Sequence, residues 1–176
     1  MPHVAVTAIG PDRPGIVAAV TGVLMRRGGN LEDTAMTNLG GHFAMVLVVE
    51  VPDDDPAALE AALQGEVAAD YGLTVTVRRM EEAEPVHVPA AAWAVTVYGA
   101  DRPGIVHEVT SALADAGANV VDLSTRVVGP DRAYVLLMEV TLPADADPEE
   151  LGERLRRIGE GLGVQVHLCA DDADVL

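Results

Sequence analysis

The sequence predicts an α+β protein built from two consecutive domains of the order βαββαβ. Three observations support this prediction: the chain repeats itself, each half alternates strand-like and helix-like segments in one order, and the composition is that of a folded protein. The chain has 176 residues, which at about 150 residues per domain suits one domain or two small ones. Hydrophobic residues make up 49% of it, too many for a disordered chain, although the net charge is −17.

The repeat is clearest around the sequence Asp-Arg-Pro-Gly-Ile-Val. It occurs at residues 12–17 and again at 101–106, an offset of 89, and 13 of the 24 positions from 10 to 33 are identical at that offset. Unrelated segments do not share so many positions, so the chain is interpreted as an internal duplication.

The duplication sets the expected domain boundaries. The first domain covers residues 1–80 and the second covers 91–170. Residues 81–90 between them are acidic and contain two prolines, which is typical of a stiff linker, and residues 171–176 form an acidic tail.

The first domain begins with a strand and a helix. Residues 4–9 are rich in Val, Ile and Thr, as strands are. Asp12 is then expected to cap a helix with Pro14 in its first turn, and the glycine at 28 is expected to end it. Apolar residues recur between them at every fourth position, as on one face of a helix: Ile16, Val20 and Leu24.

The rest of the first domain supplies a hairpin, a helix and a last strand. Residues 31–39 predict a weaker strand, the glycines at 40–41 a tight turn, and residues 43–51 a strong strand. Pro56 begins the second helix, and residues 73–80 form the closing strand.

The second domain repeats this order with a longer hairpin loop at 129–132. Its two helices carry apolar stripes at helical spacing: Ile105, Val109 and Leu113 on the first, and Leu151, Leu155, Ile158 and Leu162 on the second. The order βαββαβ, occurring twice, predicts antiparallel sheets with two helices on one face of each.

Two of the strands point to further packing. Residues 45–49 and 134–138 are apolar without alternation, so both faces of these strands need cover, and the helices supply only one. A domain of about 80 residues also buries a modest fraction of its surface alone. We expect the sheets to pack side by side or face to face, within the chain, between chains, or both.

Composition excludes several classes of protein. The acidic surface repels phosphate backbones, so direct nucleic-acid binding is not expected. The sequence contains neither a signal peptide nor an apolar run of the roughly 20 residues that span a membrane. One cysteine allows no internal disulfide. The expectation is a soluble cytoplasmic protein.

The repeated loop is the candidate binding site. Free backbone N–H groups where a strand turns into a helix favour an anion such as a carboxylate, and Gly10 and Gly15 let the backbone approach closely. Asp12 can accept a hydrogen bond from an ammonium group, and Asn30, at the start of the next strand, can both donate and accept. A zwitterionic amino acid needs both kinds of partner.

The same residues also have purely structural interpretations, which stay open at this point. Asp12 can serve only as a helix cap, Arg13 only as a partner for a surface carboxylate, and Pro14 only to set the first turn. Gly15 can serve only helix packing, and Asn30 only the turn before its strand.

The element order, the Asp-Arg-Pro-Gly-Ile loop and the following Gly-x-Asn resemble the ACT domain, a ferredoxin-like regulatory module. Two such domains without a catalytic domain resemble the family of the glycine cleavage system transcriptional repressor. The resemblance implies amino-acid binding at domain interfaces, through the first loop and the residue that starts the second strand. The positions that it implicates are Gly10, Asp12, Arg13, Pro14, Gly15, Asn30, Gly99, Asp101, Arg102, Pro103, Gly104 and Asn119.

The function that follows is regulatory. We expect a homodimeric ACT repeat that senses a small amino acid and acts through a protein partner, in the control of glycine or other amino-acid metabolism or its transcription. The alternative is a regulatory subunit of an amino-acid biosynthetic enzyme. Acetolactate synthase small subunits are similar in length, but their second half does not repeat the loop so closely.

No catalytic, metal or cofactor site is expected. The five histidines have no metal-ligand spacing, and a surface or packing role is predicted for each. His167 and Cys169 would share one face of a strand, which allows a Cys–His pair, but a buried structural thiol is preferred. The aspartates at 53–55, and those at 145 and 147, precede helix prolines, and helix entry is preferred over cation binding.

Overall fold

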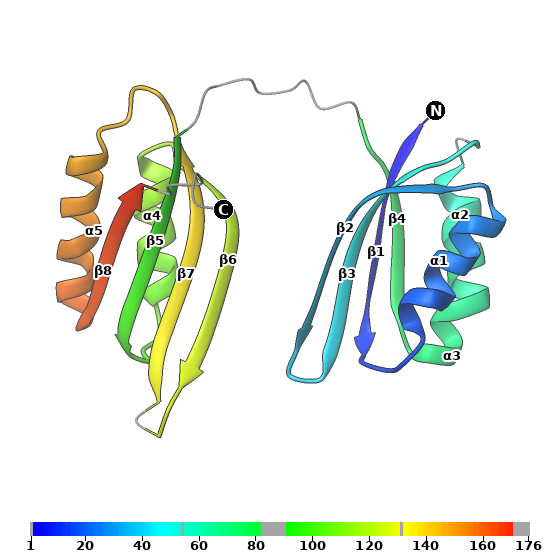
Figure 1. Cartoon of the computed structure of the whole chain (residues 1–176), viewed down its shortest axis with the longest axis horizontal. Coiled ribbons are helices and arrows are strands. Elements are labelled where there is room, and N and C mark those ends of the chain that lie inside the picture. The colour runs from blue at the N-terminus through cyan, green and yellow to red at the C-terminus, as the bar shows by residue number, and fades with distance from the viewer. Residues whose placement is uncertain (1, 54, 82–90, 131, 171–176) are drawn as a thin grey trace, which may run out of the picture. The chain divides into compact units, whose positions relative to one another are not determined.

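The computed structural model describes residues 2–53, 55–81, 91–130 and 132–170. It divides into two compact units, Met1–Pro85 and Val86–Leu176, which are considered separately (Figure 1). Most of the predicted linker at 81–90 and all of the tail at 171–176 lie outside the described residues.

Unit 1 contains one antiparallel four-stranded sheet in the order β2-β3-β1-β4. Its elements follow the predicted order, and the strong and weak strands appear where the sequence placed them. They are β1 (His3–Pro11), α1 (Ile16–Arg26), β2 (Asn30–Leu39), β3 (His42–Glu50), α2 (Pro56–Leu63), η1 (Gln64–Ala68), α3 (Ala69–Tyr71) and β4 (Thr74–Arg79).

Unit 2 has the same topology, with the strand order β6-β7-β5-β8. The fold is therefore two tandem ferredoxin-like βαββαβ units, as predicted. The elements are β5 (Ala91–Ala100), α4 (Ile105–Asp115), β6 (Asn119–Val128), β7 (Ala133–Leu142), α5 (Pro148–Leu162) and β8 (Val164–Ala170).

The second helix differs between the units by one residue. In unit 2 it is the continuous α5, 15 residues long. In unit 1 the segments α2, η1 and α3 run without a break over the corresponding stretch, and η1 is a π-helical turn. A π turn accommodates an additional residue within a helix, so both helices begin at a proline and end before a glycine with positive φ, Gly72 or Gly163.

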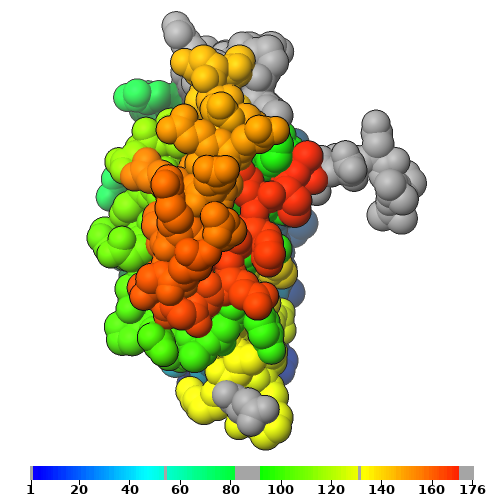
Figure 2. All heavy atoms as spheres, turned by 90° about the vertical axis from the view of Figure 1, so that its left-hand side faces the viewer, coloured from blue at the N-terminus to red at the C-terminus, as the bar shows by residue number. Residues whose placement is uncertain are grey.

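The helices of each unit cover one face of its sheet, and the core lies between them (Figure 1). Figure 2 shows this covered side of unit 2, where α5 packs beside β8. Strand residues alternate in burial because successive side chains point to opposite faces. The largest fully buried side chains come from both layers: Ile16, Leu47 and Leu63 in unit 1, and Ile105, Leu113, Leu136, Met138 and Leu155 in unit 2.

No helix among the described residues lies on the other face of either sheet, and large apolar side chains there remain accessible. In unit 1, Ile9 is 54% exposed and Val46 47%. In unit 2, Tyr98 is 55% exposed and Leu137 51%. From the apolar strands, the sequence predicted that these faces need to be covered. The packing of one sheet against another stays a prediction.

The edge strands β2 and β6 carry the same irregularity. The pairing of β2 with β3 shifts between Leu31 and Asp33, and that of β6 with β7 shifts between Val120 and Asp122. Each strand thus has a β-bulge with one residue outside the ladder, Glu32 in unit 1 and the valine at 121 in unit 2.

Candidate functional site

The repeated loop joins β1 to α1 and β5 to α4, and it is exposed in both units. Its last glycine is the N-cap of the helix, with φ of 94° at Gly15 and 96° at Gly104. Only glycine adopts these angles without strain.

The prediction that Asp12 caps the first helix, with Pro14 in its first turn, is wrong. The helix begins at Ile16 and has no side-chain cap hydrogen bond, and Pro14 precedes the N-cap residue. The glycine in the left-handed conformation turns the chain before the helix starts, and this leaves Asp12 too far from the first turn to cap it. The same holds for α4, which begins at Ile105 without a side-chain cap.

Asp12 instead bonds to the edge strand. Nδ2 of Asn38, near the end of β2, donates a hydrogen bond to Oδ2 of Asp12 over 2.6 Å. The backbone N–H of Asp12 also donates to the carbonyl oxygen of Gly41 in the hairpin, over 3.0 Å. The first loop is therefore held to the β2–β3 hairpin by both its backbone and its side chain.

The second loop has different surroundings. Asn38 pairs with Phe43 in the ladder of unit 1, and the corresponding pair in unit 2 is Val127 with Tyr134. An apolar side chain thus replaces the amide that bonds to Asp12. Burial raises the pKa of the Tyr134 phenol, and the negative charge of Asp101 raises it further.

The loop arginines reach back to the second helix of their unit. Nη1 of Arg13 donates to the backbone carbonyl oxygen of Asp70 in α3, over 3.4 Å. A Cβ added to Gly163, just after α5, would lie 3.4 Å from Cζ of Arg102. A cation at the C-terminal end of a helix is favourable for its dipole. The observed partner of Arg13 is thus a backbone carbonyl group, whereas the structural interpretation of the sequence expected a surface carboxylate.

The glycine that opens each loop has a packing role. A Cβ at Gly10 would lie 2.6 Å from the carbonyl oxygen of Gly72, and one at Gly99 would lie 2.7 Å from Cγ1 of Val164. Both distances are shorter than real Cβ contacts. Close packing against the chain where the last strand begins, at Gly72 and Leu73 in unit 1 and at Val164 in unit 2, therefore explains these two glycines.

The asparagines that start β2 and β6 lie away from the loop of their own unit. Asn30 pairs with Glu50 near the start of β1, whereas the loop follows the end of β1 and lies beside Asn38. Asn38 lies eight positions further along the strand than Asn30, a distance of about 25 Å. Asn119 occupies the same end of β6. Within one unit, Asp12 and Asn30 do not form a common site.

Each loop retains two kinds of polar group, the backbone N–H groups at the start of the helix and the carboxylate of an aspartate. The N–H groups of the first helical turn have no side-chain cap in α1 or α4 and lie at the positive end of the helix dipole. One aspartate, Asp12 or Asp101, lies in the same exposed loop. The first-turn N–H groups can donate hydrogen bonds to a carboxylate, and the aspartate can accept them from an ammonium group.

Two groups were not found from the sequence. Asn38 was overlooked because its role depends on the end of β2 lying beside the loop. His3, Glu32 and Glu50 come from three different strands, and their candidate ligand atoms all lie within 4.8 Å of one another. The only signal in the sequence was a difference between the halves, since alanine, valine and threonine occupy these positions in unit 2.

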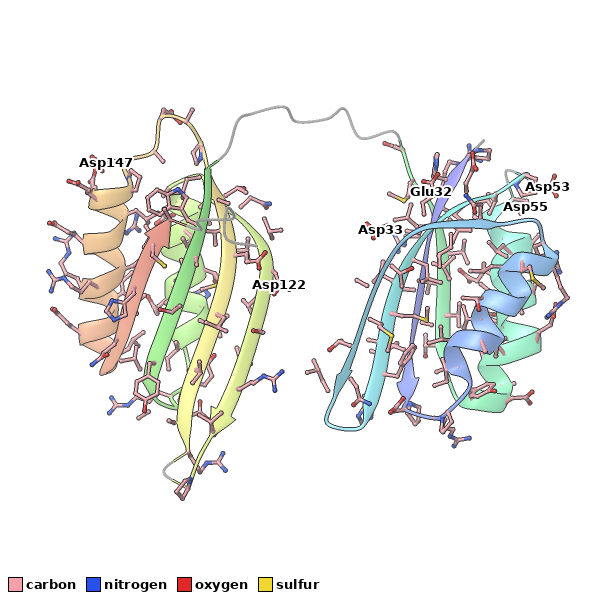
Figure 3. All side chains as sticks on the ribbon, in the orientation of Figure 1. Glu32, Asp33, Asp53, Asp55, Asp122 and Asp147 are labelled. Atoms are coloured by element: carbon pink, nitrogen blue, oxygen red, sulfur yellow. The ribbon has the colours of Figure 1, made fainter. Side chains whose placement is uncertain are left out.

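Other side chains singled out in the sequence have clear structural environments. Cys169 is exposed, so the prediction of a buried thiol is wrong: it lies on the uncovered face of β8, with Sγ 3.6 Å from the carbonyl oxygen of Ala94. Asp55 and Asp147 cap α2 and α5, which confirms their helix-entry role (Figure 3). Arg26 pairs with Glu66 over 2.6 Å.

The ACT domain family matches the chain twice, at residues 3–78 and 94–168. The chain belongs to the ACT domain family. Each match spans one unit from its first strand to its last, so the family accounts for both halves of the duplication.

Two groups of known proteins are similar to this chain, one over nearly its whole length and one over a single unit. The chain is 26% identical over 167 residues to the glycine cleavage system transcriptional repressor of Escherichia coli, covering 93% of this chain and 87% of that protein. It is 44% identical over 78 residues to a UPF0237 protein of Methanopyrus kandleri, covering 44% of this chain and 86% of that protein. This ACT repeat is thus a regulatory protein related to these two groups.

Two solved structures resemble this protein over almost the whole chain. An unknown protein from Galdieria sulphuraria has a TM-score of 0.81 at 29% identity, covering 97% of this chain and 98% of that one. A putative glycine cleavage system transcriptional repressor has a TM-score of 0.65 at 19% identity, covering 95% of each chain, which shows the fold. In the described part of this ACT protein, no helix is long and apolar enough to cross a membrane.

Proposed function

We propose that this ACT protein is a non-catalytic sensor of a small amino acid, and that it passes its state of occupancy to a protein partner. The observation that supports the proposal is the duplicated loop, which contains an aspartate and leads into a helix N-terminus without a side-chain cap in both units. An α-amino acid carries a carboxylate and an ammonium group close together, and this loop offers a partner for each.

The candidate asparagines fit a site shared between two copies of the chain. Asn30 and Asn119 are exposed, and each lies at the far end of its strand from the loop of the same unit. A second copy would therefore supply the asparagine that completes a loop site. This is the reason for proposing a homodimer, and it links amino-acid binding to the arrangement of the copies.

The signal would leave through protein contacts. With 28 acidic residues against 11 basic ones, the chain repels nucleic acid. An effect on transcription would therefore run through a second protein. The similarity to the E. coli repressor supports a role in the control of glycine or other amino-acid metabolism.

Calorimetry of the full chain with each of the twenty amino acids tests the sensor. We expect at least one small amino acid to bind, and D12A with D101A to abolish that binding. Asp33 and Asp122 lie on the bulged edge strands, away from the loops, so D33A with D122A is the matched control and should bind normally. If none of the twenty binds, or if the loop variant binds as tightly as the native chain, the proposal of an amino-acid sensor is wrong.

Recovery of the partner tests how the signal leaves. We expect the chain to retain a regulator of transcription, and added amino acid to change the amount retained. If the chain instead retains an amino-acid biosynthetic enzyme and changes its feedback inhibition, the chain is a regulatory subunit of that enzyme.

A further inference from the structure

Three side chains meet at one end of the sheet of unit 1, on the strands that begin or end there. They are His3 on β1, Glu32 on β2 and Glu50 on β3. His3 and Glu50 are cross-strand partners in the β1–β3 ladder, and Glu32 is the residue at the bulge of β2. Figure 3 labels Glu32 at this end of the sheet, close to the start of β1.

The three side chains present their polar atoms to one another. Nε2 of His3 lies 3.0 Å from Oε2 of Glu32. One nitrogen of His3 and one oxygen from each glutamate all lie within 4.8 Å of one another. The His3 side chain is 37% exposed and that of Glu32 43%, so solvent and solutes reach the cluster.

We propose that His3, Glu32 and Glu50 bind a divalent transition-metal ion. One imidazole and two carboxylates form a mixed nitrogen and oxygen set that suits Zn²⁺ and Mn²⁺. Bonds of about 2.0–2.1 Å in a tetrahedral site place ligand atoms about 3.3 Å apart. The separation of 3.0 Å between Nε2 of His3 and Oε2 of Glu32 is close to that value, so small side-chain rotations complete the site. Water occupies the position that faces solvent.

The charges at the cluster also favour a cation. Two carboxylates lie in one cluster, and a cation placed between them lowers their mutual repulsion. Unit 1 lies in a chain of net charge −17, which adds to the attraction for cations.

The second unit shows that the fold does not need this cluster. Ala92 and Thr141 take the places of His3 and Glu50, and Val121 occupies the bulge in place of Glu32. The strands, the register and the bulge are nevertheless the same. The sheet therefore forms without the interaction of His3 with Glu32, and this interaction is available for a role that is specific to unit 1.

Exchange of the residues between the units gives a direct test. The untagged full-length chain, freed of metal with a chelator, is titrated with Zn²⁺ and Mn²⁺ by calorimetry. We expect one site per chain in the native protein. The variant H3A/E32V/E50T takes the residues of unit 2 and should lose the site. The reciprocal variant A92H/V121E/T141E should bind two ions per chain.

Spectroscopy and a third variant separate this site from others. Co²⁺ should give a visible d–d absorption band in the native chain and none in H3A/E32V/E50T, while circular dichroism shows that both are folded. The loop variant D12A/D101A should keep the full metal stoichiometry, because those residues are not ligands. If the native chain binds neither metal, or H3A/E32V/E50T binds as tightly as the native chain, the proposed site is wrong.

Discussion

Asn38 donates a hydrogen bond to Asp12 over 2.6 Å, and this contact joins the edge strand β2 to the repeated loop of unit 1. The contact orients a carboxylate that would otherwise be free to rotate in an exposed loop. Its counterpart in unit 2 is absent, because Val127 takes the ladder position of Asn38. The two loops share a sequence motif and differ in how firmly their aspartate is held.

The first prediction concerns that difference. N38A removes the hydrogen bond that orients the Asp12 carboxylate. Loss of one hydrogen bond to a charged group costs roughly 1.4 kcal/mol of binding free energy, so amino-acid binding at the first loop should weaken by about tenfold. V127N should do the reverse at the second loop by giving Asp101 an amide neighbour. Calorimetry with the amino acid identified in the screen measures both changes. Unchanged affinity in N38A would show that Asn38 does not orient the site.

The second prediction concerns the N-cap glycines. G15A and G104A should each destabilise the protein by about 1–2 kcal/mol, the cost of a left-handed conformation with a Cβ. G15A should be the more harmful, because its Cβ would lie 3.0 Å from the hydroxyl oxygen of Tyr71, whereas nothing lies within 4 Å at Gly104. Urea denaturation measures the free energy of unfolding.

The control for this pair is a glycine inside a regular helix. Gly152 lies within α5, and its nearest neighbour would be 4.0 Å from an added Cβ. G152A should therefore stabilise the protein by about 0.5–1 kcal/mol. A loss of stability in G152A equal to that in G104A would show that backbone strain is not the cause.

The third prediction concerns alkaline pH. Burial and the charge of Asp101 raise the pKa of Tyr134 above the ordinary value of 10.0, so the folded state keeps the phenol proton to higher pH than the unfolded state. The stability that this provides is complete below pH 10.0 and is lost as the pH rises through the folded pKa. Y134F should lose less stability on going to strongly alkaline pH.

Spectrophotometric titration of tyrosinate tests the two causes separately. D101N removes the charge and leaves the burial, so Tyr134 should titrate at a lower pH in D101N than in the native chain and still above an unfolded control. Tyr71 and Tyr98 supply a common background in both proteins. An identical titration of D101N and the native chain would remove Asp101 as a cause.

The fourth prediction concerns the uncovered sheet faces. V46E and L137E each place a charge among accessible apolar side chains, so they should weaken the expected homodimer and lower its sedimentation coefficient at a given concentration. M25E is the matched control, because Met25 is 71% exposed on α1 and not on a sheet face. Equal dimerisation of all three variants would show that the homodimer uses another surface.

The order of elements was predictable from the sequence because apolar spacing and turn residues determine it locally. The prolines at 56 and 148 marked the start of two helices and the glycine at 28 marked the end of another, and the structure confirms all three. The duplication added a second, independent copy of the same pattern.

Contacts between distant segments were not predictable in the same way. The partner of Asp12 is 26 residues away, and a local rule assigned Asp12 to a helix cap, which a glycine with positive φ displaced. The exposure of Cys169 was missed because its strand has one face without helices. Which face a residue occupies follows from register, and register is a property of paired strands.

The bulge in β2 and β6 has a consequence for how a duplicated protein acquires a new role. It leaves one position in each repeat outside the ladder, Glu32 in one copy and Val121 in the other. A side chain there can change while every paired residue keeps its partner and its face. The two copies can thus diverge at this position without any change to the strand pairing of either sheet.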